Sequence, residues 1–163
     1  HVSSRRQRQM CIRDRCINKI YLMNTCKSWE LKKKVLPQHT DHAGVVWHGT
    51  YLNWLEESRI DSIGKAGIRY IELLNRGFEM PVYKIEIKYL MPIMIGDEII
   101  VKSSFIINQG PRIKVNSKFT NLRNKIHAEA SIDIVLINKK TFKVVRKRPL
   151  FLEHCLNNLR KGP

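Results

Sequence analysis

Long apolar runs are the first thing that this sequence lacks. No stretch approaches the roughly 18 consecutive apolar residues of a membrane-spanning helix, so we expect a soluble chain with no membrane partner. Acidic residues are also few, because 14 Asp and Glu stand against 30 Lys and Arg, which gives a net charge of +16. Hydrophobic residues still make up 43% of the 163 residues, which suits one folded domain with a real core.

Cysteine pairs of the CxxC type are missing as well. The four cysteines stand at positions 11, 16, 26 and 155, and these spacings suggest neither a zinc site nor a disulfide framework. This usage indicates a reducing compartment, and we expect a cytoplasmic protein. The sequence shows no internal repeat, no low-complexity stretch and no sign of a second domain.

Residues 1–22 differ in composition from the rest. Their first part, HVSSRRQRQMCIRDR, contains five arginines and one acid, shows no apolar periodicity and lacks the apolar core of a secretory signal. We therefore interpret residues 1–22 as a non-native or disordered leader, with Met23 as the expected start. The folded domain is then expected over residues 23–150, followed by a helical tail at residues 151–163.

The basic balance persists without the leader. Residues 23–163 hold 24 Lys and Arg and 13 Asp and Glu, a net charge of +11. Such a surface suits nucleic acid or an anionic small ligand such as a coenzyme A ester. It is equally compatible with a solvated basic face that binds nothing, which is the more common case.

One long amphipathic helix is predicted from His48 to about Gly64. On a wheel of 3.6 residues per turn one face gathers apolar side chains with Tyr51 beside them, namely Leu52, Leu55, Ile63 and Ala66. Arg59 falls inside this apolar arc, so we expect it to be paired or to lie at an interface. Residues 71–77 predict a further short helical turn.

After the helix the pattern changes to a period of two, which is typical of strands and is seen at residues 83–91, 112–120 and 126–137. The predicted strands cover residues 29–37, 83–91, 97–107, 112–120, 126–137 and 141–146. Short turns join those that follow the helix, so neighbours should run antiparallel. The expected fold class is therefore α+β, with one long central helix packed on a single antiparallel sheet of about five strands.

The stretch HTDHAGVVWHGTYLNWLEESR, residues 39–59, places an acid and a histidine around the start of the helix. Free N–H groups at a helix start can stabilise an oxyanion, and the Asp41 carboxylate can act as a base or a nucleophile. Asp41 can equally be an ordinary Asx-turn former. A metal held by Asp41 with His39, His42 and His48 matches no recognised zinc spacing, so we expect no metal.

Three motifs together resemble a known family. The loop and helix TDHAGVVWHGTYLNWLEESR, the later PIMIGDEIIV and the segment VVRKRP resemble hotdog-fold thioesterases of the 4-hydroxybenzoyl-CoA thioesterase type, including the YbgC-like acyl-CoA thioesterases. The resemblance covers about residues 30–150. It implies a hotdog fold without cofactors, a homodimer or homotetramer with sites between subunits, and acyl thioesters of coenzyme A or acyl carrier protein as substrates.

The resemblance also implies roles for individual residues. Asp41 matches the catalytic acid, His48 matches a histidine seven residues later, and Glu56 is an alternative acid beside Arg59. Substrate-binding positions are Gly44, Val45, Val46 and Tyr51. Cations that could meet coenzyme A phosphates are Lys139, Lys140, Arg146, Lys147 and Arg148.

The predicted function is therefore hydrolysis of an acyl-coenzyme A thioester to free acid and coenzyme A. Two alternatives remain: a non-catalytic acyl- or RNA-binding module on the same fold, and a dehydratase acting on hydroxyacyl thioesters. Nucleic acid is not expected, because the sequence has no glycine–aromatic RNA-binding signature.

Overall fold

The structure, a computed structural model, describes residues 27–163, so the leader predicted at residues 1–22 lies outside the described residues. The elements in chain order are β1 (Trp29–Lys34), the 3₁₀ helix η2 (Pro37–His39), α2 (His48–Lys65), α3 (Tyr70–Asn75), β2 (Phe78–Glu79), β3 (Val82–Tyr89), β4 (Glu98–Ile106), β5 (Arg112–Asn121), β6 (Ile126–Val135), β7 (Ile137–Asn138) and α4 (Leu150–Lys161).

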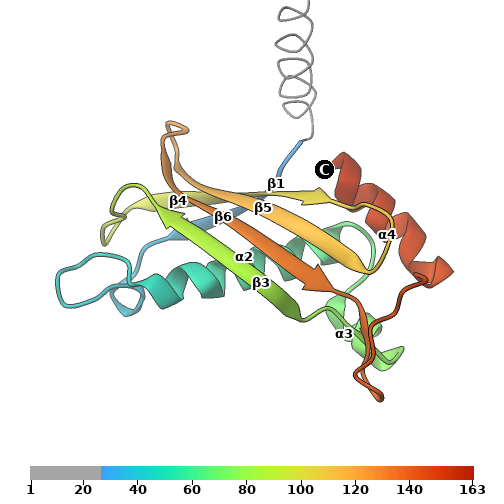
Figure 1. Ribbon diagram of the computed structural model, residues 1–163. Helices are drawn as coiled ribbons and strands as arrows, with labels where there is room; N and C mark the ends of the chain where they lie inside the picture. The colour runs from blue at the N-terminus through green and yellow to red at the C-terminus, as the bar shows by residue number, and fades with distance from the viewer. Residues whose placement is uncertain (1–26) are drawn as a thin grey trace, which may run out of the picture.

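A five-stranded sheet in the order β1-β4-β5-β6-β3 forms the body of the domain (Figure 1). Every neighbouring pair of its strands is antiparallel. Alternate side chains of β4, β5 and β6 are buried, as the period of two predicts. The predicted α+β fold of one long helix on a five-stranded antiparallel sheet is confirmed.

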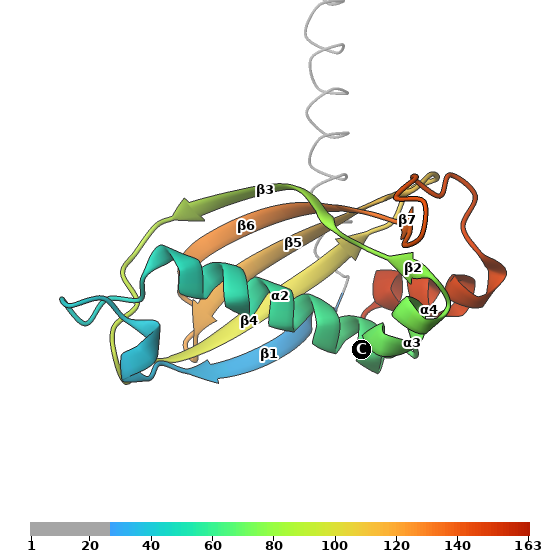
Figure 2. The ribbon, with the colours of Figure 1, turned by 90° about the horizontal axis from the view of Figure 1, so that it is seen from below.

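Helix α2 lies across one face of this sheet and packs against β1 and β4 (Figure 2). The helix buries three of its own side chains almost fully, namely Trp54, Leu55 and Ile63. Burying each such side chain contributes about 2 kcal/mol to stability. The prediction that Leu52 joins this face is wrong, since Leu52 is 42% exposed. Ile63 lies on the same stripe near the other end of α2, where Cys155 Sγ of α4 lies 3.8 Å from the Ile63 carbonyl oxygen, whereas α4 does not reach the start of α2.

Arg59 is the charged residue that the helix buries. It is 3% exposed, and its guanidinium forms a bidentate pair with the Glu56 carboxylate, with Nε 3.0 Å from Oε2. Its Nη1 also donates to the carbonyl oxygen of Met80 at 2.7 Å. The prediction that Arg59 is paired is confirmed, and the second bond ties α2 to the start of β3.

Three serine hydroxyls satisfy one another between α2 and the sheet. Ser58 Oγ lies 2.9 Å from Ser103 Oγ, which lies 2.8 Å from Ser117 Oγ. The chain of hydroxyls runs from α2 through β4 to β5. Because each hydroxyl has a partner, these buried polar groups cost the fold little.

Helix α4 closes one end of the sheet. Its apolar side is buried, with Leu152, Cys155, Leu156 and Leu159 facing the core. The indole Nε1 of Trp29 in β1 donates to the carbonyl oxygen of Leu159 at 3.3 Å, and Asn158 Nδ2 donates to the carbonyl oxygen of Ala66 at 3.0 Å. Helix α4 therefore joins the first strand to the end of α2.

The strand predicted at residues 141–146 is wrong. Instead, β7 pairs with β2, and the following residues form a tight turn that returns to a single bridge between Ile137 and Val144. The Asn138 side chain causes this reversal, because its Oδ1 accepts the N–H groups of Lys140 at 3.0 Å and Thr141 at 3.1 Å.

No helix within residues 27–163 is long and apolar enough to cross a membrane.

Candidate active site

The loop between η2 and α2 is organised by Asp41. Its Oδ1 accepts the backbone N–H groups of Ala43 at 2.9 Å and Val45 at 3.2 Å, and its own N–H donates to the carbonyl oxygen of Val45 at 2.8 Å. Gly44 completes the turn with a φ of +74°, where a side chain would be strained. This is an Asx-turn. Within the described part of the chain, the second carboxylate oxygen of Asp41 has no hydrogen-bond partner.

A second segment, residues 90–95, braces this loop from the side of the sheet. The Val46 N–H donates to the carbonyl oxygen of Ile93 at 2.9 Å, and the Ile95 N–H donates to the carbonyl oxygen of Gly44 at 2.9 Å. A β-bridge joins Val45 and Met94. The loop is thus fixed by backbone bonds on both sides, although Asp41 itself is exposed.

Helix α2 begins with free donors. Its N-cap is Trp47, and no side chain within residues 27–163 caps the helix start, which leaves the N–H groups of His48 and Gly49 available to a ligand. The ring of Trp47 lies over Gly49 so closely that any Cβ at Gly49 would collide with it. A side chain at Gly49 would therefore displace the Trp47 ring, which is 43% exposed.

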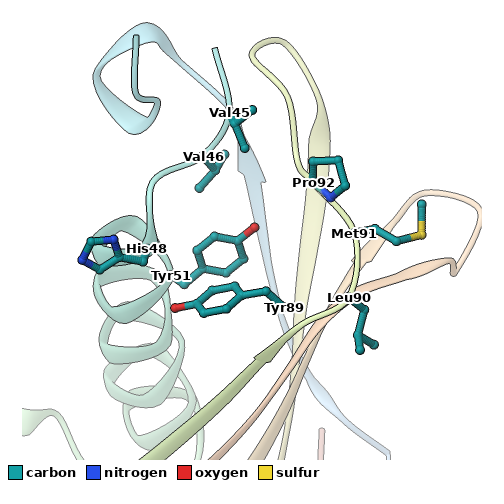
Figure 3. A pocket seen from close by; sticks show the side chains of 8 residues that line it. All are labelled: Val45, Val46, His48, Tyr51, Tyr89, Leu90, Met91 and Pro92. Atoms are coloured by element: carbon teal, nitrogen blue, oxygen red, sulfur yellow. The ribbon is translucent and has the colours of Figure 1, made fainter. Parts of the chain in front are cut away.

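A cavity of about 380 Å³ opens beside this helix start (Figure 3). Tyr51 from α2 and Tyr89 from the end of β3 project into its centre, with their ring centroids 5.0 Å apart, and His48 stands at its margin. The residues that line it are Val45, Val46, His48, Tyr51, Tyr89, Leu90, Met91 and Pro92. The wall is mainly apolar, with polar groups supplied by the two tyrosine hydroxyls and the imidazole.

Four of the predicted site residues meet at this cavity, and three do not. Val45, Val46, His48 and Tyr51 line it, whereas Asp41 and Gly44 lie in the loop behind its wall and Glu56 is held by Arg59. Sequence patterns assign no role in the site to Tyr89, Leu90, Met91 and Pro92. They predict Tyr89 only as a strand residue, because it is the fold that brings the end of β3 to the start of α2.

Burial raises the pKa of Tyr51. Removal from water, with a smaller contribution from neighbouring Tyr89, raises this pKa from the ordinary value of 10.0 to about 12. The phenol, which is protonated at neutral pH with either value, thus keeps its proton further into alkaline solution and can donate a hydrogen bond into the cavity.

This pKa predicts a loss of stability at alkaline pH. An unfolded tyrosine ionises near its ordinary pKa of 10.0 and the folded one near about 12, so stabilisation present below about pH 10 is lost as the pH rises towards 12. The free energy of unfolding, measured with urea at about pH 9 and about pH 11, should fall less in Tyr51→Phe than in the wild type. Burial also raises the pKa of the Cys155 thiol to about 11. This thiol is present in both proteins, so its contribution to the pH dependence is the same in each. Equal losses in the two proteins would contradict the prediction.

Metal ligands do not gather in the structure. Within residues 27–163, no group of three or more His, Cys, Asp or Glu side chains could hold a metal ion. The ring of His39 contacts Trp54 with centroids 5.2 Å apart, and that of His48 contacts Trp47 at 5.1 Å. These two histidines thus pack against separate aromatic rings.

Comparison with known proteins identifies the family of the chain. The model of the thioesterase-like superfamily matches residues 35–159. The protein sll0410 of Synechocystis sp., which carries an esterase name, is 30% identical over 84% of this chain and 83% of its own length. The acyl-CoA thioester hydrolase YbgC of Escherichia coli is 21% identical over 64% of this chain and 78% of its own.

A solved structure shows the same architecture. The DHNA-CoA thioesterase of Staphylococcus aureus superposes with a TM-score of 0.69 and 25% identity, covering 73% of this chain and 80% of its own. The family match extends over the loop, α2, strands β3 to β6 and most of α4, and so spans most of the described residues. The chain therefore belongs to the thioesterase-like superfamily, whose hydrolases share the hotdog fold.

Proposed function

We propose that the chain hydrolyses acyl-coenzyme A thioesters to a free acid and coenzyme A. One observation carries the proposal: the uncapped start of α2 adjoins an apolar cavity, directly after a loop that presents a carboxylate. The acyl-CoA name of YbgC supports coenzyme A as the carrier, and acyl carrier protein remains a second carrier to be tested.

The helix start supplies stabilisation of the oxyanion in this proposal. The N–H groups of His48 and Gly49 lie at the positive end of an 18-residue helix and have no capping side chain among the described residues. As the thioester carbonyl becomes tetrahedral its oxygen gains negative charge, which these donors stabilise. The neutral Tyr51 hydroxyl adds a further donor in the same cavity.

Asp41 is the proposed base or nucleophile. Only its Oδ1 is used by the turn, so the other oxygen is available to activate water or to attack the carbonyl. Asp41 lies outside the cavity wall of a single chain. A site completed by a second copy explains how this loop can meet a substrate.

Strand β3 provides the surface for that second copy. It is the edge of the sheet next to β6, with its other edge unpaired among the described residues. Helix α2 packs on β1 and β4, which leaves Tyr83, Ile85 and Tyr89 of β3 at least 37% exposed. An unpaired, apolar edge strand is a template for pairing with another chain. We propose a homodimer in which β3 pairs antiparallel with its copy.

This pairing also suggests where the phosphates bind. A cavity of about 620 Å³ at the beginning of β3 is lined by Tyr83, Arg112 and Arg146, with the Arg112 guanidinium 4.6 Å from the Tyr83 ring centroid. Antiparallel pairing brings the beginning of one β3 beside the end of the other. The two arginines then face the diphosphate of the substrate. Arg148 is less suited, because its Nη2 already donates to the carbonyl oxygen of Asn108 at 2.6 Å.

Thiol release from a panel of acyl thioesters tests the proposal. We expect turnover of at least one short, medium, long or aromatic acyl-CoA, and the preferred acyl group defines the specificity. The same acyl groups on acyl carrier protein compare the two carriers. If no acyl thioester releases thiol, the proposal is overturned.

The two alternatives are distinguished in the same experiment. Hydration of crotonyl-CoA without release of thiol would indicate a dehydratase, because hydration leaves the thioester bond intact. RNA binding that survives about 0.15 M salt, without thiol release, would indicate the binding module that the net charge of +11 over residues 23–163 favours.

A further inference from the structure

His127, the second residue of β6, contacts the wall of the cavity through both its backbone and its ring. Its carbonyl oxygen accepts the N–H groups of Leu90 at 2.9 Å and Met91 at 3.0 Å. Its ring Nδ1 lies 2.9 Å from the carbonyl oxygen of Pro92. All three of these contacted residues line the cavity, whereas His127 itself does not.

The geometry defines which ring nitrogen carries the proton. A carbonyl oxygen only accepts hydrogen bonds, so Nδ1 must be the donor to Pro92. The other nitrogen, Nε2, is buried and has no partner within residues 27–163. The ring N–H at Nδ1 is therefore directed at the carbonyl oxygen of Pro92, in the wall of the cavity.

The lack of an N–H on Pro92 explains why the side chain of His127 holds residues 90–93. Proline has no N–H, so it cannot join a ladder of backbone bonds as donor. The next residue, Ile93, accepts the Val46 N–H at 2.9 Å through its carbonyl oxygen. The path from His127 through Pro92 and Ile93 thus reaches the loop that carries Asp41.

We infer that His127 is a positioning residue for the reaction: its ring N–H fixes the Leu90–Ile93 wall and, through it, the Asp41 loop. This inference rests on the proposed thioesterase function for its catalytic consequence. Loss of the bond should lower kcat by about tenfold or more, because small displacements of reacting groups have large effects on rate. KM should change less than about threefold, since the diphosphate contacts lie elsewhere.

A pair of amide substitutions separates positioning from packing. In His127→Asn the side-chain amide nitrogen occupies nearly the place of Nδ1 and can still donate to Pro92. In His127→Gln the amide reaches the place of Nε2, so the bond is lost although size and polarity are kept. We expect His127→Gln to lower kcat by at least about tenfold and His127→Asn to restore it to within about threefold of the wild type.

The matched control is Thr120→Val. Thr120 is also buried in the sheet and donates through its hydroxyl to a backbone carbonyl, that of Ile100 at 3.4 Å, and it does not line the cavity. Its kcat should stay within about twofold of the wild type. A merely structural role for His127 would make the control and His127→Gln lose activity in proportion to their loss of stability.

Hydrogen exchange supplies a readout that needs no substrate. The amides of Leu90, Met91 and Val46 should exchange faster in His127→Gln than in the wild type, His127→Asn or Thr120→Val. Unchanged exchange, or equal kcat in the Asn and Gln variants, would overturn the inference. If the wild type hydrolyses no acyl thioester, the proposed function fails, and the exchange pattern still decides whether His127 positions the wall.

Discussion

Asp41→Asn should lower turnover of the preferred acyl-CoA at least about a hundredfold, the usual size for a lost acid–base group. The substitution keeps the shape of the side chain. Asparagine Oδ1 can still accept the N–H groups of Ala43 and Val45, which are 2.9 and 3.2 Å from the native oxygen. The loop and the melting temperature should therefore be preserved, and KM should change little. Single-turnover thiol release measures the chemical step.

Glu56→Gln is the matched control for this change. Glu56 is the other acid considered for the site, and its carboxylate pairs with the buried Arg59 guanidinium. We expect a lower melting temperature, because Arg59 loses its charged partner, and only a small effect on turnover in the molecules that stay folded. If Asp41→Asn turns over normally and Glu56→Gln does not, Glu56 is the catalytic acid and Asp41 only forms the turn.

Ile85→Glu should convert the protein to a monomer and abolish most of its activity. Ile85 is 37% exposed on the edge strand β3, so a monomer would tolerate a charge there. Within a β3–β3 interface the same charge would be buried without a partner, at a cost of about several kcal/mol. Sedimentation at micromolar concentration should show a dimer or larger assembly for the wild type and a monomer for the variant. Turnover should fall by at least about a hundredfold, because the shared site is lost.

Leu122→Glu is the corresponding control. Leu122 is 62% exposed at the turn between β5 and β6, away from the edge formed by β3. This variant should keep the assembly and the activity of the wild type. A wild type that sediments as a fully active monomer would contradict the shared site.

The helix and most of the sheet are predictable because their patterns are local. Apolar positions repeat along α2, and alternate residues of β4, β5 and β6 are buried, so spacing alone identifies these elements. The segment at residues 141–146 is also predicted as a strand but forms none, because the side chain of Asn138 turns the chain back first. Local pattern cannot show that a side chain competes with strand pairing.

The loop and the helix start are also predictable, whereas the opposite wall is not. Asp41 through Tyr51 are continuous in sequence, so their chemistry can be read together. Tyr89 to Pro92 come from the end of β3, and His127 comes from β6, which pairs with β3 in the sheet. Their meeting depends on strand order, which a single sequence does not specify. Exposure of β3 similarly depends on where α2 lies across the sheet, and not on the alternation within the strand.

The bond between Trp29 and Leu159 has a consequence for how the chain folds. It joins residues 130 positions apart, and it connects the first strand of the sheet to the helix that closes it. During synthesis β1, α2 and β3 emerge long before α4, so this end of the core stays open until residue 161 has left the ribosome. Contacts of such large sequence separation slow folding. We therefore expect late, chain-length-dependent acquisition of protease resistance, with nascent chains that end before α4 remaining sensitive.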